Sequence, residues 1–242
     1  MIKKAFLVFG RRWGALLKDP SYRISLFAGL VFLVGAYVVS ILASSYHDSW
    51  VFVSVGDIIL DNIPTYDMEI FFSEVMYGLV LLTFLHPLIF RPEIAPFAMK
   101  TFAMLTLLRS GFILLTNIGP PTDFYFNGIE MGTGLLSDPV FRNDLFFSGH
   151  TAYPFLAFLI YRKSIVAWIL LFGSFLMAVT VLLMHVHYSI DVFSAFFIAY
   201  GVYNISDMVF NKLNLRFKNI LKSSKVELDN EKKSLNVKKI PL

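Results

Sequence analysis

Long apolar runs separated by short polar connections make up most of this chain. A helix that crosses the roughly 30 Å of bilayer hydrocarbon needs about 20 mostly apolar residues. Six runs fit this requirement, the fourth being the shortest, and they cover residues 24–43, 70–90, 94–118, 145–161, 165–185 and 188–210. The pattern therefore predicts an all-α, polytopic membrane protein with six transmembrane helices.

Composition agrees with a membrane protein, because 57% of the 242 residues are hydrophobic and only 16% are charged. A soluble domain of this size is far less apolar. We expect a basic cytoplasmic segment at 1–23, one membrane domain at 24–210, and a basic tail at 211–242 that contacts anionic lipid and then becomes disordered. The first run is too long for a signal-peptide core, so we interpret it as a retained anchor.

The distribution of basic residues predicts the orientation, since short loops rich in Lys and Arg stay in the cytoplasm. The segment before the first run carries six of them, Lys3, Lys4, Arg11, Arg12, Lys18 and Arg23. The connection 46–69 has five acidic residues and neither Lys nor Arg. Both chain ends are thus expected inside, with the connections 46–69, 119–144 and 185–188 on the exoplasmic face.

The net charge of +4 follows from this topology and from the tail. A nucleic-acid-binding surface needs a basic stripe with aromatic platforms on a soluble face, and the sequence has no such stripe. The absence of Cys excludes disulfides, thiol nucleophiles and thiolate metal sites.

Two polar clusters interrupt the apolar runs at the predicted exoplasmic face. The fourth run opens with Ser-Gly-His-Thr at 148–151, and the junction of the fifth and sixth runs carries His185, His187 and Asp191. A polar side chain inside a membrane costs free energy unless it has a partner or a chemical function. Because both clusters lie at one face, His150 and His187 can share a site.

The second cluster has a spacing suited to histidine chemistry. His187 and Asp191 are four residues apart, so on a helix they lie on one face, where the carboxylate can orient the imidazole. With His150 added, the set contains two His and one Asp but no Ser or Cys nucleophile. Phosphoryl transfer suits this set, since one imidazole can attack phosphorus while the other protonates the departing oxygen.

These residues carry a family resemblance. The stretch NDLFFSGHT resembles the third motif of the sphingomyelin synthase family, and HYSIDVFSAFF is similar to its His-Tyr-Thr-x-Asp-Val motif. DIILDNIPTYDMEIFFSE and LLRSGFILLTNIGPP agree more loosely, so the resemblance runs from Asp57 to Asn204. This family belongs to the type 2 phosphatidic acid phosphatase superfamily.

The resemblance implies a six-span helical fold with an exoplasmic site that needs no cofactor and no metal. It implies transfer of phosphocholine or phosphoethanolamine from a glycerophospholipid to ceramide or a diacylglycerol-like acceptor. His187 would be the nucleophile and Asp191 its orienting partner. His150 would protonate the leaving diacylglycerol oxygen and then deprotonate the acceptor hydroxyl. The expected partners are therefore lipids in the membrane.

The sequence also departs from its relatives. Asn143 stands where the motif has Gly, with Asp144 matching the motif's Asp. The lipid phosphatases of the superfamily carry a Lys upstream of Arg-Pro and an Arg before the last His, whereas Arg91-Pro92 lacks that Lys and Val181 occupies the Arg position. Fewer cations favour a phosphodiester, with one negative charge, over a phosphomonoester dianion.

Five further residues are candidate substrate-binding groups, namely Arg109, Asp144, Ser148, Glu74 and Tyr188. Arg109 lies inside the third run, where it can bind phosphate or pair with Glu74 or Asp144. Asp144 can cap the fourth helix near Phe147 or contact the headgroup. His185 is either a helper or an interfacial histidine, and Glu130 has no assigned function.

Aromatic residues gather in and near the connection 119–144, at Phe124, Tyr125, Phe126, Phe141, Phe146 and Phe147. They can hold a choline cation, although an interfacial aromatic belt explains them without a ligand. Two other functions stay open. One is hydrolysis, as a lipid phosphatase or phospholipase C-like enzyme with the same residues, and the other is a non-enzymatic transporter or scaffold.

Overall fold

The computed structural model describes residues 2–125 and 144–237, and the regular structure in these ranges is entirely helical. The α-helices are α1 (Ile2–Lys18), α2 (Pro20–Asp48), α3 (Met76–Phe90), α4 (Ala95–Leu115), α5 (Gly149–Tyr161), α6 (Ile165–Leu183) and α7 (Ser189–Val237). Three short helical turns, η1 (Leu60–Asn62), η2 (Phe71–Val75) and η3 (Pro92–Ile94), lie between them. The predicted all-α class is confirmed.

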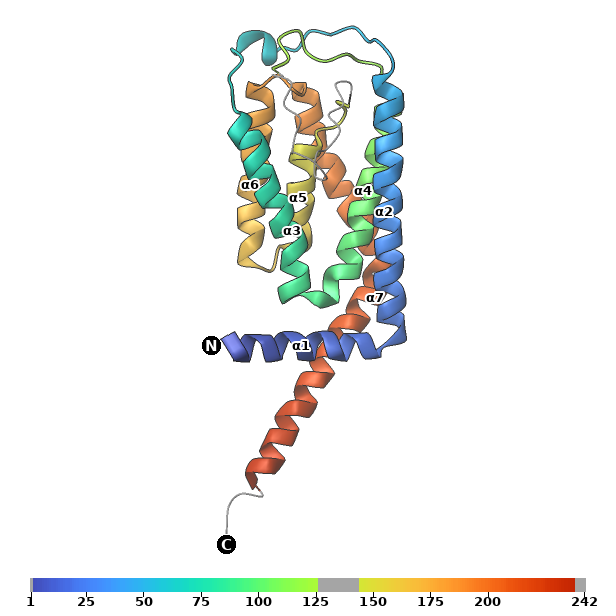
Figure 1. Ribbon diagram of the computed structural model, residues 1–242, viewed down its shortest axis with the longest axis vertical. Coiled ribbons are helices and arrows are strands. Elements are labelled where there is room, and N and C mark those ends of the chain that lie inside the picture. Colours follow the sequence, from blue (N-terminus) through green and yellow to red (C-terminus); the bar gives the residue numbers. More distant parts are fainter. Residues whose placement is uncertain (1, 126–143, 238–242) are drawn as a thin grey trace.

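Helices α2 to α7 form an upright bundle, and α1 lies across one end of it (Figure 1). Helix α5 is in the interior, where it packs against both α6 and α7. Its residues Ala152, Leu156 and Ala157 have no exposed surface. Small and apolar side chains at these positions allow neighbouring helices to approach closely, as is usual in membrane bundles.

Five helices are long and apolar enough to cross a membrane among the residues described: α2, α3 with η2, α4 with η3, α6 and the first part of α7. The fourth predicted span is different, because α5 has only 13 residues. At 1.5 Å per residue it is about 20 Å long, too short to cross the hydrocarbon alone. Residues 144–148 precede it without helical structure, so α5 begins below the ends of α6 and α7 (Figure 1).

Helix ends follow local sequence signals. Asp19 precedes α2, and its Oδ1 accepts the N–H groups of Ser21 and Tyr22 at 2.7 and 3.3 Å. Pro20 occupies the first helical position, where its missing N–H costs nothing. Ser164 Oγ caps α6 in the same way, accepting the N–H of Val166 at 3.4 Å. These caps fix the start of each helix against its neighbours.

Helix α7 continues beyond the bundle to Val237, and the disorder predicted for the end of the tail at 211–242 stays a prediction. Next to the bundle, α7 packs against α1 and the start of α2. Phe217 is 2% exposed and forms a small core with Leu16 and Tyr22, both fully buried. Apolar burial of this kind stabilises α7 where it leaves the bundle. The predicted orientation of the ends stays a prediction.

Candidate active site

The two histidine motifs meet at the end of the bundle opposite α1. The backbone N–H of Ser148 donates to the carbonyl of Asp191 at 3.1 Å, which ties the start of α5 to the start of α7. The rings of His150 and His187 are 6.1 Å apart between centroids and inclined by 59°. The structure thus brings together the three residues that the sequence nominates as catalytic.

His187 and Asp191 lie at the turn that leads into α7. His187 Nδ1 is 3.5 Å from Asp191 Oδ2, and the two residues are 4% and 2% exposed. The same carboxylate oxygen accepts the N–H of Tyr188 at 3.0 Å. Since Nδ1 is turned toward the carboxylate, Nε2 on the far side of the ring is the nitrogen left for chemistry.

The sixth run was predicted to begin at residue 188, and α7 begins at Ser189, so His187 precedes the helix and Asp191 lies in its first turn. His185 causes this local shape with a φ of 52°, which is unusual for a residue with a side chain. It lies in the five-residue connection 184–188 between α6 and α7. The helix dipole favours the negative charge of Asp191 in this first turn of α7.

His150 is the second residue of α5 and is partly exposed. One face of its ring lies on Phe72 of η2, with the ring centroids 4.3 Å apart. The Ser148 side chain makes no capping bond to the first turn, and its Oγ accepts instead from Thr151 Oγ1 at 3.2 Å. Backbone N–H groups at such a helix start favour an anion, so this end of α5 suits a phosphate.

Arg109 from α4 is engaged in holding the segment before α5. Its Nη2 lies 2.7 Å from Asp144 Oδ1, and Nη1 donates to Asp144 Oδ2 at 3.0 Å. Nε donates to the carbonyl of Phe147 at 2.9 Å, and Nη2 also donates to the carbonyl of Asp144 at 3.2 Å. The sequence left open whether Arg109 pairs with Glu74 or with Asp144, and in the structure it pairs with Asp144. The charge of this buried arginine is therefore already balanced.

Asp144 and Glu74 occupy different environments. Asp144 accepts from Ser44 Oγ at 3.1 Å as well as from Arg109, and so links α2, α4 and the segment before α5. Its carboxylate accepts hydrogen bonds from these two side chains and does not cap the start of α5. Glu74 lies in η2 with its side chain exposed, and it has no ionic partner among the described residues.

Tyr188 anchors two connections to the site. Its side chain is 3% exposed, and its hydroxyl donates to the carbonyl of Gly119 at 2.8 Å and accepts the N–H of Val55 at 3.1 Å. His185 is also buried, and its Nδ1 lies 3.4 Å from Thr65 Oγ1. Both side chains thus face the connections rather than the gap between His150 and His187.

Asp57 is a site residue that the sequence did not nominate. Its Oδ2 accepts the N–H of Ser189 at 2.6 Å, while Oδ1 accepts from Ile59 and Leu60 at 2.9 and 3.2 Å. Burial works to raise the pKa of Asp57, but the N–H donors of Ser189, Ile59 and Leu60 outweigh it and lower the pKa below its ordinary value. A remote carboxylate therefore caps α7 beside Asp191. In the sequence, the only indication of a role for Asp57 was that the resemblance to the sphingomyelin synthase family begins at this residue.

A cavity of about 440 Å³ lies beside Asp191, between the start of α7, the connections that follow α2 and α4, and the segment before α5. Its wall combines polar and apolar residues, including Asp57, Tyr188, Asp191, Ile58, Ile118 and Leu145. Such a wall suits the boundary between a headgroup and lipid chains.

Two of the aromatic residues near the site pack against other side chains of the bundle. Phe147 is fully buried, and Phe146 packs edge-on against Phe112 at 5.5 Å. Phe126, Glu130 and Phe141 lie outside the described residues. Within the described ranges, no group of three His, Cys, Asp or Glu is placed to hold a metal ion.

Fold and site together define an integral membrane protein with a helical bundle and a His-His-Asp cluster at one end. Residues 143–208 match the model of the PAP2 superfamily C-terminal region, the segment that contains His150, His187 and Asp191. This match supports a place in the PAP2 superfamily and a lipid phosphatase or phosphotransferase type of activity. The match does not indicate the sphingomyelin synthase family within this superfamily. No curated protein and no solved structure matches the chain.

Proposed function

We propose that the protein is a lipid phosphotransferase that moves a phosphorylated headgroup, phosphocholine or phosphoethanolamine, from a glycerophospholipid to ceramide or a related lipid alcohol. The observation that carries the proposal is the pair of imidazoles, His150 and His187, 6.1 Å apart, with Asp191 behind His187. At this separation both rings can reach one phosphoryl group from different sides.

The first half of the reaction forms a phosphohistidine. His187 Nε2 attacks phosphorus, and the bond from phosphorus to the diacylglycerol oxygen breaks. His150 gives its proton to that oxygen, so that diacylglycerol leaves as a neutral alcohol. An anionic substrate beside His150 favours the protonated ring, because opposite charges attract at short range. Asp191 stabilises the positive charge that develops on His187.

The second half restores the enzyme. His150, now neutral, accepts the proton of the acceptor hydroxyl, whose oxygen attacks phosphorus. The bond from phosphorus to His187 Nε2 breaks, and the headgroup leaves on the acceptor. If water takes the acceptor's place the result is hydrolysis, so the same residues also support a lipid phosphatase or phospholipase C-like activity.

Charge balance supports a phosphodiester substrate. Among the described residues, Arg109 is the arginine next to the site, and Asp144 already neutralises it. The position before His187 that holds Arg in lipid phosphatases is Val181, which is fully buried in α6. A monoanionic phosphodiester needs less positive charge than a dianionic phosphomonoester, so the site favours the diester.

The test uses the full chain in liposomes that contain phosphatidylcholine, phosphatidylethanolamine and a labelled ceramide, with lipid products identified by mass spectrometry. The variants are His187→Gln and, as a matched control, His86→Gln in α3 near the other end of the bundle. We expect a phosphorylated ceramide and diacylglycerol in equal amounts from the wild type and the control, and neither from His187→Gln.

Other products would change the proposal in defined ways. Diacylglycerol together with free phosphocholine or phosphoethanolamine, at the same rate without ceramide, would identify a hydrolase. If no phospholipid loses its headgroup in any mixture, the enzymatic function is wrong and the scaffold or transporter alternative stands.

A further inference from the structure

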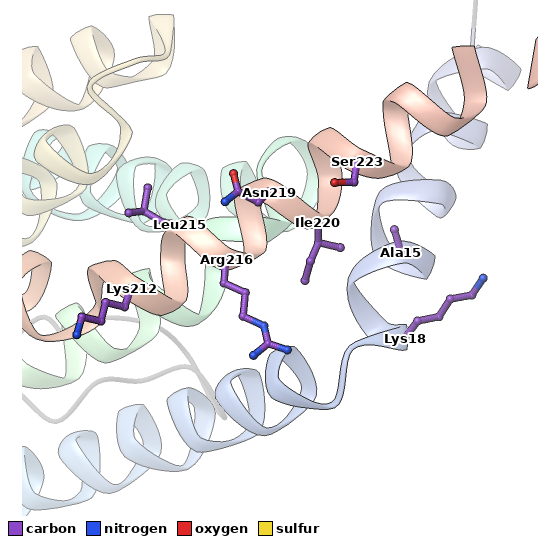
Figure 2. A pocket seen from close by; sticks show the side chains of 8 residues that line it. All are labelled: Ala15, Lys18, Lys212, Leu215, Arg216, Asn219, Ile220 and Ser223. Carbon is purple, nitrogen blue, oxygen red and sulfur yellow. The ribbon is translucent and has the colours of Figure 1, made fainter. Parts of the chain in front are cut away.

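A basic groove lies at the end of the bundle opposite the candidate active site. It has a volume of about 810 Å³ and is formed between α1 and the part of α7 that extends beyond the bundle (Figure 2). Its lining has three cations and no acid: Lys18, Lys212, Arg216, Ala15, Leu215, Asn219, Ile220 and Ser223. A groove with this composition attracts anions and also offers apolar contact.

The two walls of the groove are fixed to each other. The Tyr22 and Phe217 rings meet edge to face with centroids 5.1 Å apart, and fully buried Leu16 completes this small core. Arg216 Nη2 lies 2.9 Å from Asp19 Oδ2. Trp13 Nε1 donates to the carbonyl of Leu88 at 3.0 Å and thereby fastens α1 to the end of α3. The groove is therefore a built feature rather than a chance gap.

The groove lies just outside the apolar part of the bundle. The membrane-spanning part of α7 ends at Phe210, and the groove residues of α7 follow it directly. The span formed by α2 begins at Pro20, and the groove residues of α1 come directly before it. This is the depth at which lipid headgroups lie. Phe9 and Leu17 of α1 are 36% and 43% exposed, as expected for a helix resting in the interface.

We infer that this groove binds the phosphate of an anionic phospholipid in the leaflet opposite the candidate active site. Lys18 and Lys212 have no ionic partner among the described residues, while Arg216, paired on one side with Asp19, retains further N–H donors for a phosphate oxygen. Leu215 and Ile220 contact the glycerol and upper acyl chain. The bound lipid holds α1 against α7.

The test measures lipid contact at Trp13, which is close to the groove. The chain has three Trp, so Trp50→Phe and Trp168→Phe leave only this reporter. The protein is placed in phosphatidylcholine bilayers that contain brominated phosphatidylglycerol or brominated phosphatidylcholine, and quenching of Trp13 fluorescence is recorded. We expect the anionic lipid to quench at lower mole fraction than the zwitterionic one.

Two triple variants separate a site from general surface charge. Lys18→Gln, Lys212→Gln and Arg216→Gln together remove the groove cations, and Arg11→Gln, Arg23→Gln and Lys222→Gln remove three exposed cations that do not line it. We expect the preference for the anionic lipid to fall about tenfold in the first variant and less than about twofold in the second. Equal losses in both variants would overturn the inference.

A further variant and a soluble competitor complete the test. Lys18→Gln with Lys212→Gln keeps the Arg216–Asp19 pair, so a lost preference there cannot come from undocking of α1. Glycerol 3-phosphate is added without anionic lipid and then in competition with it. If it displaces the lipid at micromolar concentration, the ligand is a soluble phosphate compound and the lipid assignment is wrong.

Discussion

Ser148 donates its backbone N–H to the carbonyl of Asp191 at 3.1 Å, and the two residues are 0% and 2% exposed. This bond joins the residue before α5 to the first turn of α7, away from water. His150 lies two residues beyond one end of it, and His187 four residues before the other. The bond therefore holds the backbones of the two histidine motifs next to each other.

The first prediction concerns the charge behind His187. Asp191→Asn keeps a side-chain oxygen for the N–H of Tyr188 but removes the carboxylate that faces His187 Nδ1. We expect headgroup transfer to slow by about 10²- to 10⁴-fold, since an amide does not stabilise the imidazolium in the same way. Initial rates measure the effect, and thermal unfolding should be close to that of the wild type.

Asp123→Asn is the matched control for this change, because Asp123 is an exposed acid in the connection after α4. Its rate should equal that of the wild type. A wild-type rate for Asp191→Asn would show that Asp191 has no part in the reaction.

The second prediction concerns the cap that Asp57 places on α7. Asn at this position accepts on one oxygen only, so Asp57→Asn loses at least one of the bonds to Ser189, Ile59 and Leu60. We expect a loss of about 1–3 kcal/mol in stability near neutral pH, because hydrogen bonds to charged groups are the stronger ones.

The pH dependence of this loss has a definite sign. The pKa of Asp57 in the folded protein is below its ordinary value of 3.8. Its contribution is therefore complete above that value and disappears as the pH falls through the folded pKa. The difference in thermal unfolding between the wild type and Asp57→Asn should thus begin to narrow only below about pH 4, and should disappear once the pH is below the folded pKa. A gap that stays constant down to acid pH would mean that the charge of Asp57 is not the cause.

The spans were largely predictable from the sequence, whereas the details of the site were not. Apolar length located the spanning helices, and the distribution of basic residues between them placed His150, His187 and Asp191 at one end. The start of α5 could not be read from the sequence, because Phe146 and Phe147 continue the apolar run. In the structure both residues precede the helix, and Arg109 holds this segment through the carbonyl of Phe147. The bond from Ser189 to Asp57 joins residues 132 positions apart, and no local pattern records such a contact.

The third prediction tests the packing of α3 against α6. A Cβ added at Gly173 would lie 2.4 Å from Cδ2 of Leu79 and 3.2 Å from its Cγ. Gly173→Ala should therefore force Leu79 from its position and cost about 1–3 kcal/mol. Leu79→Ala alone leaves a cavity and should cost about 2–5 kcal/mol.

The double variant is the informative one. With Ala at both positions the added methyl group fills part of the space that Leu79 leaves, so the combined loss in unfolding free energy should be smaller than the sum of the two. Additive losses would mean that the two residues do not touch. Gly201→Ala in α7 is the control, because nothing lies within 4 Å of a Cβ there and its stability should not fall.

The fourth prediction decides what Arg109 does. Arg109→Gln leaves the carboxylate of Asp144 without its cation and should cost about 3–5 kcal/mol, as expected for a broken buried pair. Asp144→Asn, which leaves the arginine unpaired, should be similarly harmful. The double variant removes both charges, so its thermal stability should be higher than that of either single variant.

Activity of that double variant separates the two roles of Arg109. If the arginine only positions residues 144–148, the recovered fold should recover most of the headgroup transfer, with KM close to the wild type. If it also binds the phosphate, stability should return without activity, and KM should rise. The present geometry, with Arg109 bound to Asp144 and to the Phe147 carbonyl, favours the first outcome. A stable double variant that does not transfer the headgroup would contradict it and make Arg109 a substrate-binding residue.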